Sequence, residues 1–135
     1  YALPHDWTRE QALGFWLSPE KEATFVAVDE AGQVLGTYYL NANQMGPGAH
    51  VANCGYVTAA WAAGKGVART MCVHSQAEAK ARGFRAMQFN SVVSTNVRAV
   101  RLWEALGFET VGRLPGAFAH PTAGFVDALV MFKTL

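Results

Sequence analysis

The chain has 135 residues, of which 51% are hydrophobic and 16% are charged, and its formal net charge at pH 7 is +1. A chain of this length can bury one hydrophobic core and is too short for two ordinary domains, so we predict a single domain over residues 1–135. The small net charge and the absence of a long basic run argue against nucleic acid or an anionic membrane as the main partner. No apolar run approaches the roughly 18 residues that span a bilayer.

Cysteine usage and the start of the chain bear on the cellular compartment. Two cysteines, Cys54 and Cys72, in a domain of this size give neither a disulfide framework nor the spacing of a metal site. We expect both thiols to be free and buried, and we expect no bound metal. Residues 1–6 do not have the pattern of a signal peptide, which predicts a soluble cytoplasmic protein. The sequence does not determine the oligomeric state, and a homodimer is one possible state.

The first elements predicted along the chain are a helix and three strands. Thr8 is a good N-cap for a short helix, which ends before Pro19 because a residue that precedes proline avoids helical geometry. The next two apolar segments are rich in β-branched and aromatic residues, and the turn at residues 29–32 between them predicts an antiparallel hairpin. The three strands cover residues 23–28, 34–40 and 51–58.

A long helix follows the third strand. It is predicted from about Lys65 to Arg82, and Gly83 ends it. The next strand covers residues 84–93. Because a helix connects it to the strand at residues 51–58, we expect these two strands to be parallel, with a right-handed crossover.

Apolar residues then recur at helical spacing from Asn96 to Gly107, which predicts a second amphipathic helix. Two further strands are expected at residues 109–114 and 125–132, with a turn-rich loop at residues 115–121 between them. This order of elements predicts an α+β fold. We expect a mixed, largely antiparallel sheet with helices on both faces and one parallel central strand pair.

A glycine-rich segment, Ala63-Gly64-Lys65-Gly66-Val67-Ala68, joins the third strand to the long helix. Glycines let backbone N–H groups turn toward a ligand, and the first turn of a helix adds N–H donors without partners. The segment predicts a cradle for a phosphate group, although an ordinary glycine-rich turn has the same pattern. A dinucleotide-binding motif would need glycine at Arg69, and a P-loop would need serine or threonine after Lys65, so neither motif fits.

A second segment supports an anionic cofactor: residues 96–108, with the sequence NVRAVRLWEALGF. Together with the glycine-rich segment it resembles the GCN5-related N-acetyltransferase family, and the resemblance covers nearly the whole chain. It implies acetyl-CoA as co-substrate and a fold whose central parallel strands are splayed. Relatives usually begin with a further strand and helix that are not in this sequence. Ala63 stands where relatives often have a polar side chain.

The resemblance implies contacts for the co-substrate. Asn96 bonds the pantetheine arm through its amide, and the alternative role for this residue is a helix cap. Lys65 and Arg69 add charge near the pyrophosphate, or lie on a solvated helix face instead. Three strand residues lie beside the pantetheine arm: Tyr56, Val57 and Thr58. The pyrophosphate meets the backbone N–H groups of Gly64, Gly66, Val67, Ala68 and Arg69.

The usual acid and base of the family are missing. Many relatives have a tyrosine at the position of Trp103 that protonates the leaving thiolate, and an indole cannot act as that acid, so we expect Trp103 to pack in the core. Residues 50–57 contain no Asp or Glu that can serve as a base. His50 can take this role through water, or it is a surface residue at a strand end.

Two asparagines lie on the strands that part in the family. We expect Asn53 and Asn90 to face the cleft, where they orient the acceptor nitrogen and polarise the thioester carbonyl; the alternative is that they bridge the sheet by hydrogen bonds. Asp127 lies within an apolar strand, either as a paired structural carboxylate or as a group that binds an amine. We favour the structural role.

The predicted function is transfer of an acetyl group from acetyl-CoA to the amine of a small molecule by direct attack in a ternary complex. Residues 86–93 and 125–130 also resemble the subgroup that contains fungal proline-analogue acetyltransferases, which implies an amino or imino acid as acceptor. The alternative function is a non-catalytic module that holds acetyl-CoA or CoA, as a sensor or an assembly subunit.

Overall fold

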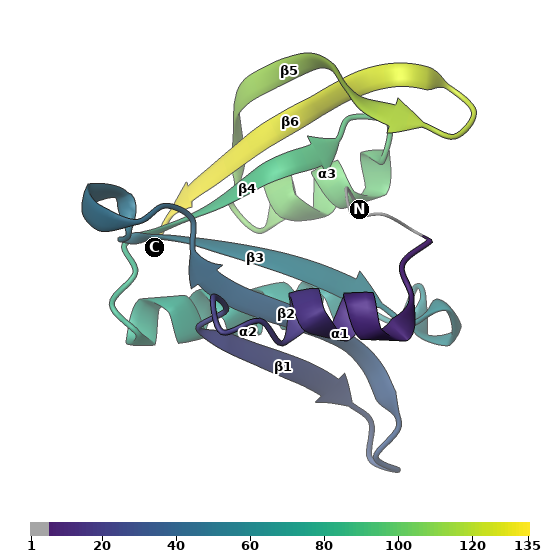
Figure 1. Cartoon of the computed structure of the whole chain (residues 1–135), viewed down its shortest axis with the longest axis vertical. Coiled ribbons are helices and arrows are strands. Elements are labelled where there is room, and N and C mark those ends of the chain that lie inside the picture. Colours follow the sequence, from purple (N-terminus) through teal and green to yellow (C-terminus); the bar gives the residue numbers. More distant parts are fainter. Residues whose placement is uncertain (1–5) are drawn as a thin grey trace.

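The computed structural model describes residues 6–135, so residues 1–5, which include most of the segment without a signal-peptide pattern, lie outside the described part. The elements in chain order are α1 (Arg9–Trp16), β1 (Ala23–Val28), β2 (Val34–Ala42), η1 (Gly46–Gly48), β3 (Val51–Thr58), η2 (Ala60–Ala62), α2 (Val67–Ala81), β4 (Ala86–Val93), α3 (Val97–Ala105), β5 (Glu109–His120) and β6 (Gly124–Thr134). The strands form one six-stranded sheet with the order β1-β2-β3-β4-β6-β5. Figure 1 shows helices on both faces of this sheet. Among the strand pairs of residues 6–135, β3 with β4 is parallel and the others are antiparallel, so the predicted α+β fold class is confirmed.

Local sequence explains the first elements. Thr8 caps α1 in a capping box: its hydroxyl accepts a hydrogen bond from the Gln11 N–H, and the Gln11 side chain accepts one from the Thr8 N–H. The β1–β2 hairpin turns at Asp29, whose Oδ1 accepts hydrogen bonds from the N–H groups of Ala31 and Gln33. The capped helix and the antiparallel hairpin are therefore confirmed.

The helices cover the two faces of the sheet unequally. α2 and α3 pack on one face, which we call the α2–α3 face, and α1 packs on the other, the α1 face. On the α1 face the ring of Tyr39 contacts Phe15 and Trp16 of α1. Cys54 and Cys72 are free and buried on the α2–α3 face, as predicted. The main core lies on that face and includes Tyr38, Leu40, Met71, Ala79, Met87, Phe89, Leu129 and Met131.

The parallel strands part soon after they begin. Among the described residues, β3 and β4 pair at residues 51–52 and 86–87 and no further. β3 nevertheless stays paired with β2 through Thr58, and β4 stays paired with β6 through Val93, so each strand follows its outer neighbour. Figure 1 shows the two strands diverging toward their carboxyl ends. From Asn53 onward, one edge of β3 therefore has no neighbouring strand.

The predicted loop at residues 115–121 is wrong, because β5 continues through this segment as far as His120. β5 is the outermost strand on its side of the sheet, where a proline or an irregular register costs few hydrogen bonds. The pairing with β6 shifts between Leu114 and Phe118, and Gly116 in this stretch has a φ of 59°. The turn residues thus form an irregularity within the strand.

Asp127 stabilises that irregularity from β6. Its carboxylate accepts a hydrogen bond from the Gly116 N–H at 3.0 Å and another from Arg113 Nη1 at 2.6 Å. The bond from Gly116, followed by the bond from Arg113, lowers the pKa of the Asp127 carboxyl below its ordinary value. The structural role that we favoured for this residue is the one observed.

The second helix differs slightly from its prediction. α2 begins at Val67 rather than near Lys65, because the residues before it form a glycine turn. Its end agrees with the prediction, since Gly83 follows with a φ of 93°. No helix within residues 6–135 has both the length and the apolar character needed to cross a membrane.

Candidate active site

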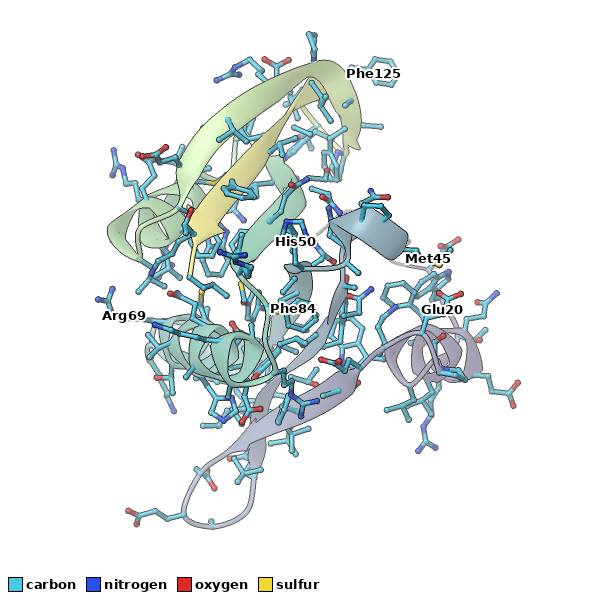
Figure 2. The ribbon with its side chains drawn as sticks, turned by 90° about the vertical axis from the view of Figure 1, so that its left-hand side faces the viewer. Glu20, Met45, His50, Arg69, Phe84 and Phe125 are labelled. Carbon is cyan, nitrogen blue, oxygen red and sulfur yellow. The ribbon has the colours of Figure 1, made fainter. Side chains whose placement is uncertain are left out.

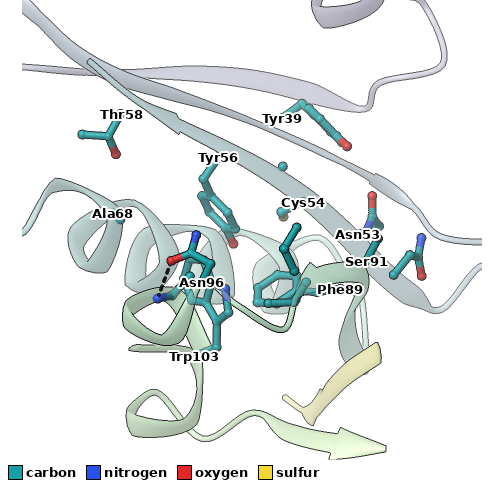
Figure 3. Close-up of a pocket in the computed structure, with 15 residues that line it drawn as sticks. Tyr39, Asn53, Cys54, Tyr56, Thr58, Ala68, Phe89, Ser91, Asn96 and Trp103 are labelled. Atoms are coloured by element: carbon teal, nitrogen blue, oxygen red, sulfur yellow. Dashed lines mark hydrogen bonds between the residues drawn. The ribbon is translucent and has the colours of Figure 1, made fainter. Parts of the chain in front are cut away.

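A pocket of about 340 Å³ lies where β3 and β4 diverge. Figure 3 shows Thr58 and Ala68 at one end of it and Asn53 and Ser91 at the other. The pocket therefore extends from the start of α2 to the middle of the sheet. Its lining comes from β2, β3, β4, α2, α3 and the residue before α3: Tyr39, Asn53, Cys54, Gly55, Tyr56, Thr58, Ala68, Phe89, Asn90, Ser91, Val92, Val93, Asn96, Ala99 and Trp103.

Ala68 lies at the α2 end of the pocket, and the glycine turn comes just before it in the chain. Gly64 and Gly66 have φ values of 77° and 75°, in the left-handed region that favours glycine. Apart from their chain neighbours, no heavy atom of the described residues lies within 4 Å of the point where a Cβ would project from either glycine. Gly66 is the N-cap of α2 and has no side chain to occupy the N–H groups of the first turn. The turn therefore presents backbone donors to open space beside Ala68.

The middle of the pocket is aromatic. The centroid of the Trp103 ring lies 5.3 Å from that of Tyr56 and 5.0 Å from that of Phe89. The Tyr56 hydroxyl is hydrogen-bonded to Ser75 Oγ at 2.6 Å, and burial raises the pKa of this hydroxyl well above its ordinary value. Burial likewise raises the pKa of the Cys54 thiol to about 12. Neither group ionises near neutral pH, so we interpret both as packing groups.

Side-chain amides form the far end of the pocket. Asn53 Nδ2 donates a hydrogen bond to the backbone carbonyl of Gln88 at 2.9 Å, and so bridges β3 and β4 where they begin to part. Gln88 Nε2 donates to Asn90 Oδ1 at 2.9 Å, and Asn90 Nδ2 donates to Asn43 Oδ1 at 2.7 Å. Asn53 thus has the sheet-bridging role that we considered as an alternative, and both Asn53 and Asn90 also line the pocket.

Asn96 has the capping role that we considered as an alternative to a ligand contact. Its Oδ1 accepts a hydrogen bond from the Ala99 N–H at 3.3 Å, drawn as a dashed line in Figure 3, so it caps α3. The same side chain lines the pocket. Because the cap uses the oxygen, the Nδ2 group can donate to a ligand at the same time.

The structure does not bring His50 to the pocket. This residue is exposed and lies in the turn before β3, and its backbone carbonyl accepts a hydrogen bond from the Arg85 N–H. The pocket opens only beyond residues 51–52, where β3 is still paired with β4, so a residue before β3 lies outside it. Val57 is also outside, with 44% of its surface exposed, whereas Tyr56 and Thr58 on either side of it line the pocket.

The two cations expected near the glycine turn are exposed. Lys65 lies within the turn itself. Arg69 follows in the first turn of α2 and lies on the outer surface of that helix (Figure 2). Both side chains are close enough in sequence to the turn to reach a group bound there.

Sequence reasoning missed several residues of the pocket, among them Tyr39 and Ser91. Tyr39 belongs to a neighbouring strand and pairs with Gly55, a register that no local pattern shows. Ser91 follows Asn90 within an irregular stretch of β4, between Phe89 and Val92. The alternation of side chains along a regular strand does not predict this irregular register, so it could not show that Ser91 lines the pocket.

Comparisons with known proteins agree with this geometry. The chain matches the model of the acetyltransferase (GNAT) family over residues 2–108. A solved structure of a GCN5-related N-acetyltransferase from Kribbella flavida is 46% identical, with a TM-score of 0.92, and the match covers 100% of this chain and 82% of that one. A phosphinothricin acetyltransferase from Sinorhizobium meliloti, solved in complex with acetyl-CoA, is 24% identical, with a TM-score of 0.78 over 93% of this chain and 68% of that one. At 24% identity, the similarity to the Sinorhizobium meliloti structure shows a shared fold only.

A curated relative is the N-acetyltransferase aca1 of Schizosaccharomyces pombe, which is 31% identical over 119 residues. The match covers 84% of this chain and 54% of the relative, so the chain spans about half the length of the curated relative that it matches. The family match covers most of the chain, and the match to the Kribbella flavida protein covers all of it. The chain therefore belongs to the acetyltransferase (GNAT) family.

Proposed function

We propose that the protein is an N-acetyltransferase that moves an acetyl group from acetyl-CoA to the amine of a small molecule by direct attack in a ternary complex. One observation carries the proposal. β3 and β4 part to form a pocket with Ala68, which follows the glycine turn, at one end and the amides of Asn53 and Asn90 at the other. Membership of the acetyltransferase family supports the same reaction class.

The residues at the α2 end fit the phosphate part of acetyl-CoA. The space above Gly64 and Gly66 is open, and the backbone N–H groups of the first turn of α2 adjoin it. The free edge of β3 offers backbone groups to the pantetheine arm, and Asn96 offers its Nδ2. When bound, acetyl-CoA supplies an activated acetyl group.

The far end fits the acceptor amine. Asn53 and Asn90 lie on the two parted strands, where their amides orient the amine and polarise the carbonyl that it attacks. No Asp, Glu or Lys stands among the described residues that line this pocket. An amide is not a strong base, so the amine binds neutral or loses its proton to water. Positioning alone can supply several powers of ten in rate.

We further propose an amino or imino acid as acceptor, on the resemblance of residues 86–93 and 125–130 to the proline-analogue subgroup. Such an acceptor carries a carboxylate next to its amine. A cytoplasmic location and a homodimer stay predictions from the sequence.

The test is acetyl-CoA-dependent thiol release by the purified protein across a panel of small amines, amino acids and imino acids, including proline and its analogues. The proposal expects release that depends on the acceptor. The sensor or assembly module expects acetyl-CoA binding in calorimetry with no release for any acceptor. Absence of both binding and release would contradict both functions.

Trp103→Phe tests the assignment of Trp103 to packing. We expect this variant to keep the parental acetyl-CoA affinity and the parental pH dependence of turnover. Its free energy of unfolding is expected to fall by about 1–3 kcal/mol, because part of the contact with Tyr56 and Phe89 is lost. A pH–rate profile and thermal unfolding measure the two effects. A selective loss of turnover in a folded variant with normal acetyl-CoA affinity would assign the indole to the chemistry instead.

A further inference from the structure

Asn90 lies in a stretch of β4 that has no paired neighbour strand. In the described part of the chain, β4 pairs with β3 only as far as Met87. Its pairing with β6 is interrupted between Phe89 and Val92. Within residues 6–135, Asn90 therefore has no partner in the register on either side, and the residue is exposed. Strand pairing alone does not fix the direction of this amide.

Two neighbouring amides hold the Asn90 side chain, one at its oxygen and one at its nitrogen. Gln88 Nε2 donates to Asn90 Oδ1 at 2.9 Å, and Asn90 Nδ2 donates to Asn43 Oδ1 at 2.7 Å. An asparagine side chain has two N–H donors and one oxygen. These bonds use the oxygen and one N–H, so they fix the plane of the amide and leave its second N–H for a group bound in the pocket that Asn90 lines.

Asn43 is attached to the closed part of the sheet. It directly follows β2, and its backbone N–H donates to the Val51 carbonyl at 2.8 Å. Val51 in turn pairs with Ala86, in the short region where β3 and β4 are still together. The bond from Asn90 to Asn43 therefore joins the unpaired stretch of β4 to the part of the sheet where β2, β3 and β4 are continuous.

Gln88 connects the two amides of the pocket. Its backbone carbonyl accepts a hydrogen bond from Asn53 Nδ2 at 2.9 Å, and its side chain donates to Asn90. Asn53 and Asn90 line the pocket, whereas Asn43 and Gln88 are not among its described lining residues. A change in the side chain of Asn43 or Gln88 thus reaches the pocket through Asn90.

We propose that Asn43 and Gln88 are positioning residues for acetyl transfer, which hold the Asn90 amide in one orientation before the acceptor binds. An exposed side chain that is already ordered does not lose its freedom on binding, and a donor that is already in place needs no reorganisation during the reaction. This inference rests on the proposed function, because it needs Asn90 to act on the reacting groups.

A double-mutant cycle tests the role of Asn43. Asn43→Ala is expected to lower kcat/KM for the best acceptor about tenfold, because the Asn90 amide must then be ordered when the acceptor binds. Its acetyl-CoA affinity is expected to stay parental. In an Asn90→Ala background the same change is expected to have almost no effect, since no amide is left to hold. Gln44→Ala is the matched control: it shortens an exposed amide side chain at the next position, outside the described lining of the pocket.

A pair of charged variants separates hydrogen bonding from charge. Asn43→Asp keeps an oxygen that accepts from Asn90 Nδ2, whereas Gln88→Glu removes the donor to Asn90 Oδ1. Both variants add a negative charge beside the same amide. We expect Asn43→Asp to keep most of the parental kcat/KM, and Gln88→Glu to lose at least as much as Asn43→Ala.

Nuclear magnetic resonance relaxation of the Asn90 side-chain amide measures the positioning without reference to activity. The parent is expected to show a restricted amide, and Asn43→Ala an amide that is mobile on the picosecond-to-nanosecond timescale, with Gln44→Ala like the parent. Asn90→Ala identifies the resonance. A parent that releases thiol with no acceptor contradicts the proposed function, while the relaxation data still decide whether Asn43 holds Asn90.

Each of the following results would overturn the positioning role. A folded Asn43→Ala variant with parental kinetics would do so, as would an equal effect of this change with and without Asn90, which would assign Asn43 to the stability of the sheet alone. Equal losses in Asn43→Asp and Gln88→Glu would indicate an effect of charge. Unchanged mobility of the Asn90 amide in Asn43→Ala would show that the bond does not restrain it.

Discussion

Gly66→Asp is expected to weaken acetyl-CoA binding by about 100-fold or more. Gly66 caps α2 with a φ of 75°, and the space into which a side chain would project is open, so the new carboxylate would stand in the proposed phosphate cradle. Two like charges about 4 Å apart repel each other by about 4 kcal/mol at an effective dielectric constant of 20. Titration calorimetry with acetyl-CoA measures the dissociation constant.

Two control variants separate charge from backbone strain. Gly66→Asn places a neutral side chain of the same shape in the cradle, and we expect it to bind acetyl-CoA more tightly than Gly66→Asp. Gly83→Asp introduces the same residue at a left-handed glycine with open surroundings at the other end of α2, and we expect parental affinity. Parental acetyl-CoA affinity in a folded Gly66→Asp variant would show that the cradle is assigned wrongly.

Asn53→Ala and Asn90→Ala are each expected to reduce kcat/KM for the best acceptor by about 30-fold to 1000-fold, with acetyl-CoA affinity almost unchanged. A preorganised hydrogen bond to the reacting groups contributes on the order of 2–4 kcal/mol in the transition state, and both amides line the acceptor end of the pocket. Steady-state kinetics with the best acceptor, together with calorimetry for acetyl-CoA, measure the two quantities.

Asn41→Ala is the matched control for these variants. Asn41 is the same residue type, pairs with Asn53 across β2 and β3, and does not line the pocket. Its Oδ1 is buried without a hydrogen-bond partner among the described residues, so its loss is expected to cost little stability and no activity. If the folded Asn53→Ala and Asn90→Ala variants show parental kinetics and differ only in stability, both amides are parts of the sheet and not of the chemistry.

Elements with strong local signals were predicted well from the sequence. The Thr8 cap, the turn at Asp29 and the helix end at Gly83 each depend on residues within a few positions of one another, and the structure shows all three. The family resemblance also came from two short segments and is confirmed by the family match.

The loop predicted at residues 115–121 was wrong because the prediction used local signals alone. Pro115 and Gly116 are turn signals in isolation, but an outer strand accommodates them, and strand order is not a local property.

By itself, the sequence determined the local conformation, the family and the glycine turn, because these depend on neighbouring residues. Only the tertiary structure decided which polar groups surround the pocket, since the bonds that position them join distant parts of the chain. Asn53 bonds to Gln88 across 35 positions, and Asn90 bonds to Asn43 across 47. The same reason excluded His50, which lies before the point where the strands part, and brought His120 of the β5–β6 hairpin to the turn before α3. Neither position follows from any spacing in the sequence. That of His50 depends on where the pairing of β3 with β4 ends, and that of His120 depends on the pairing of β6 with β4 and β5.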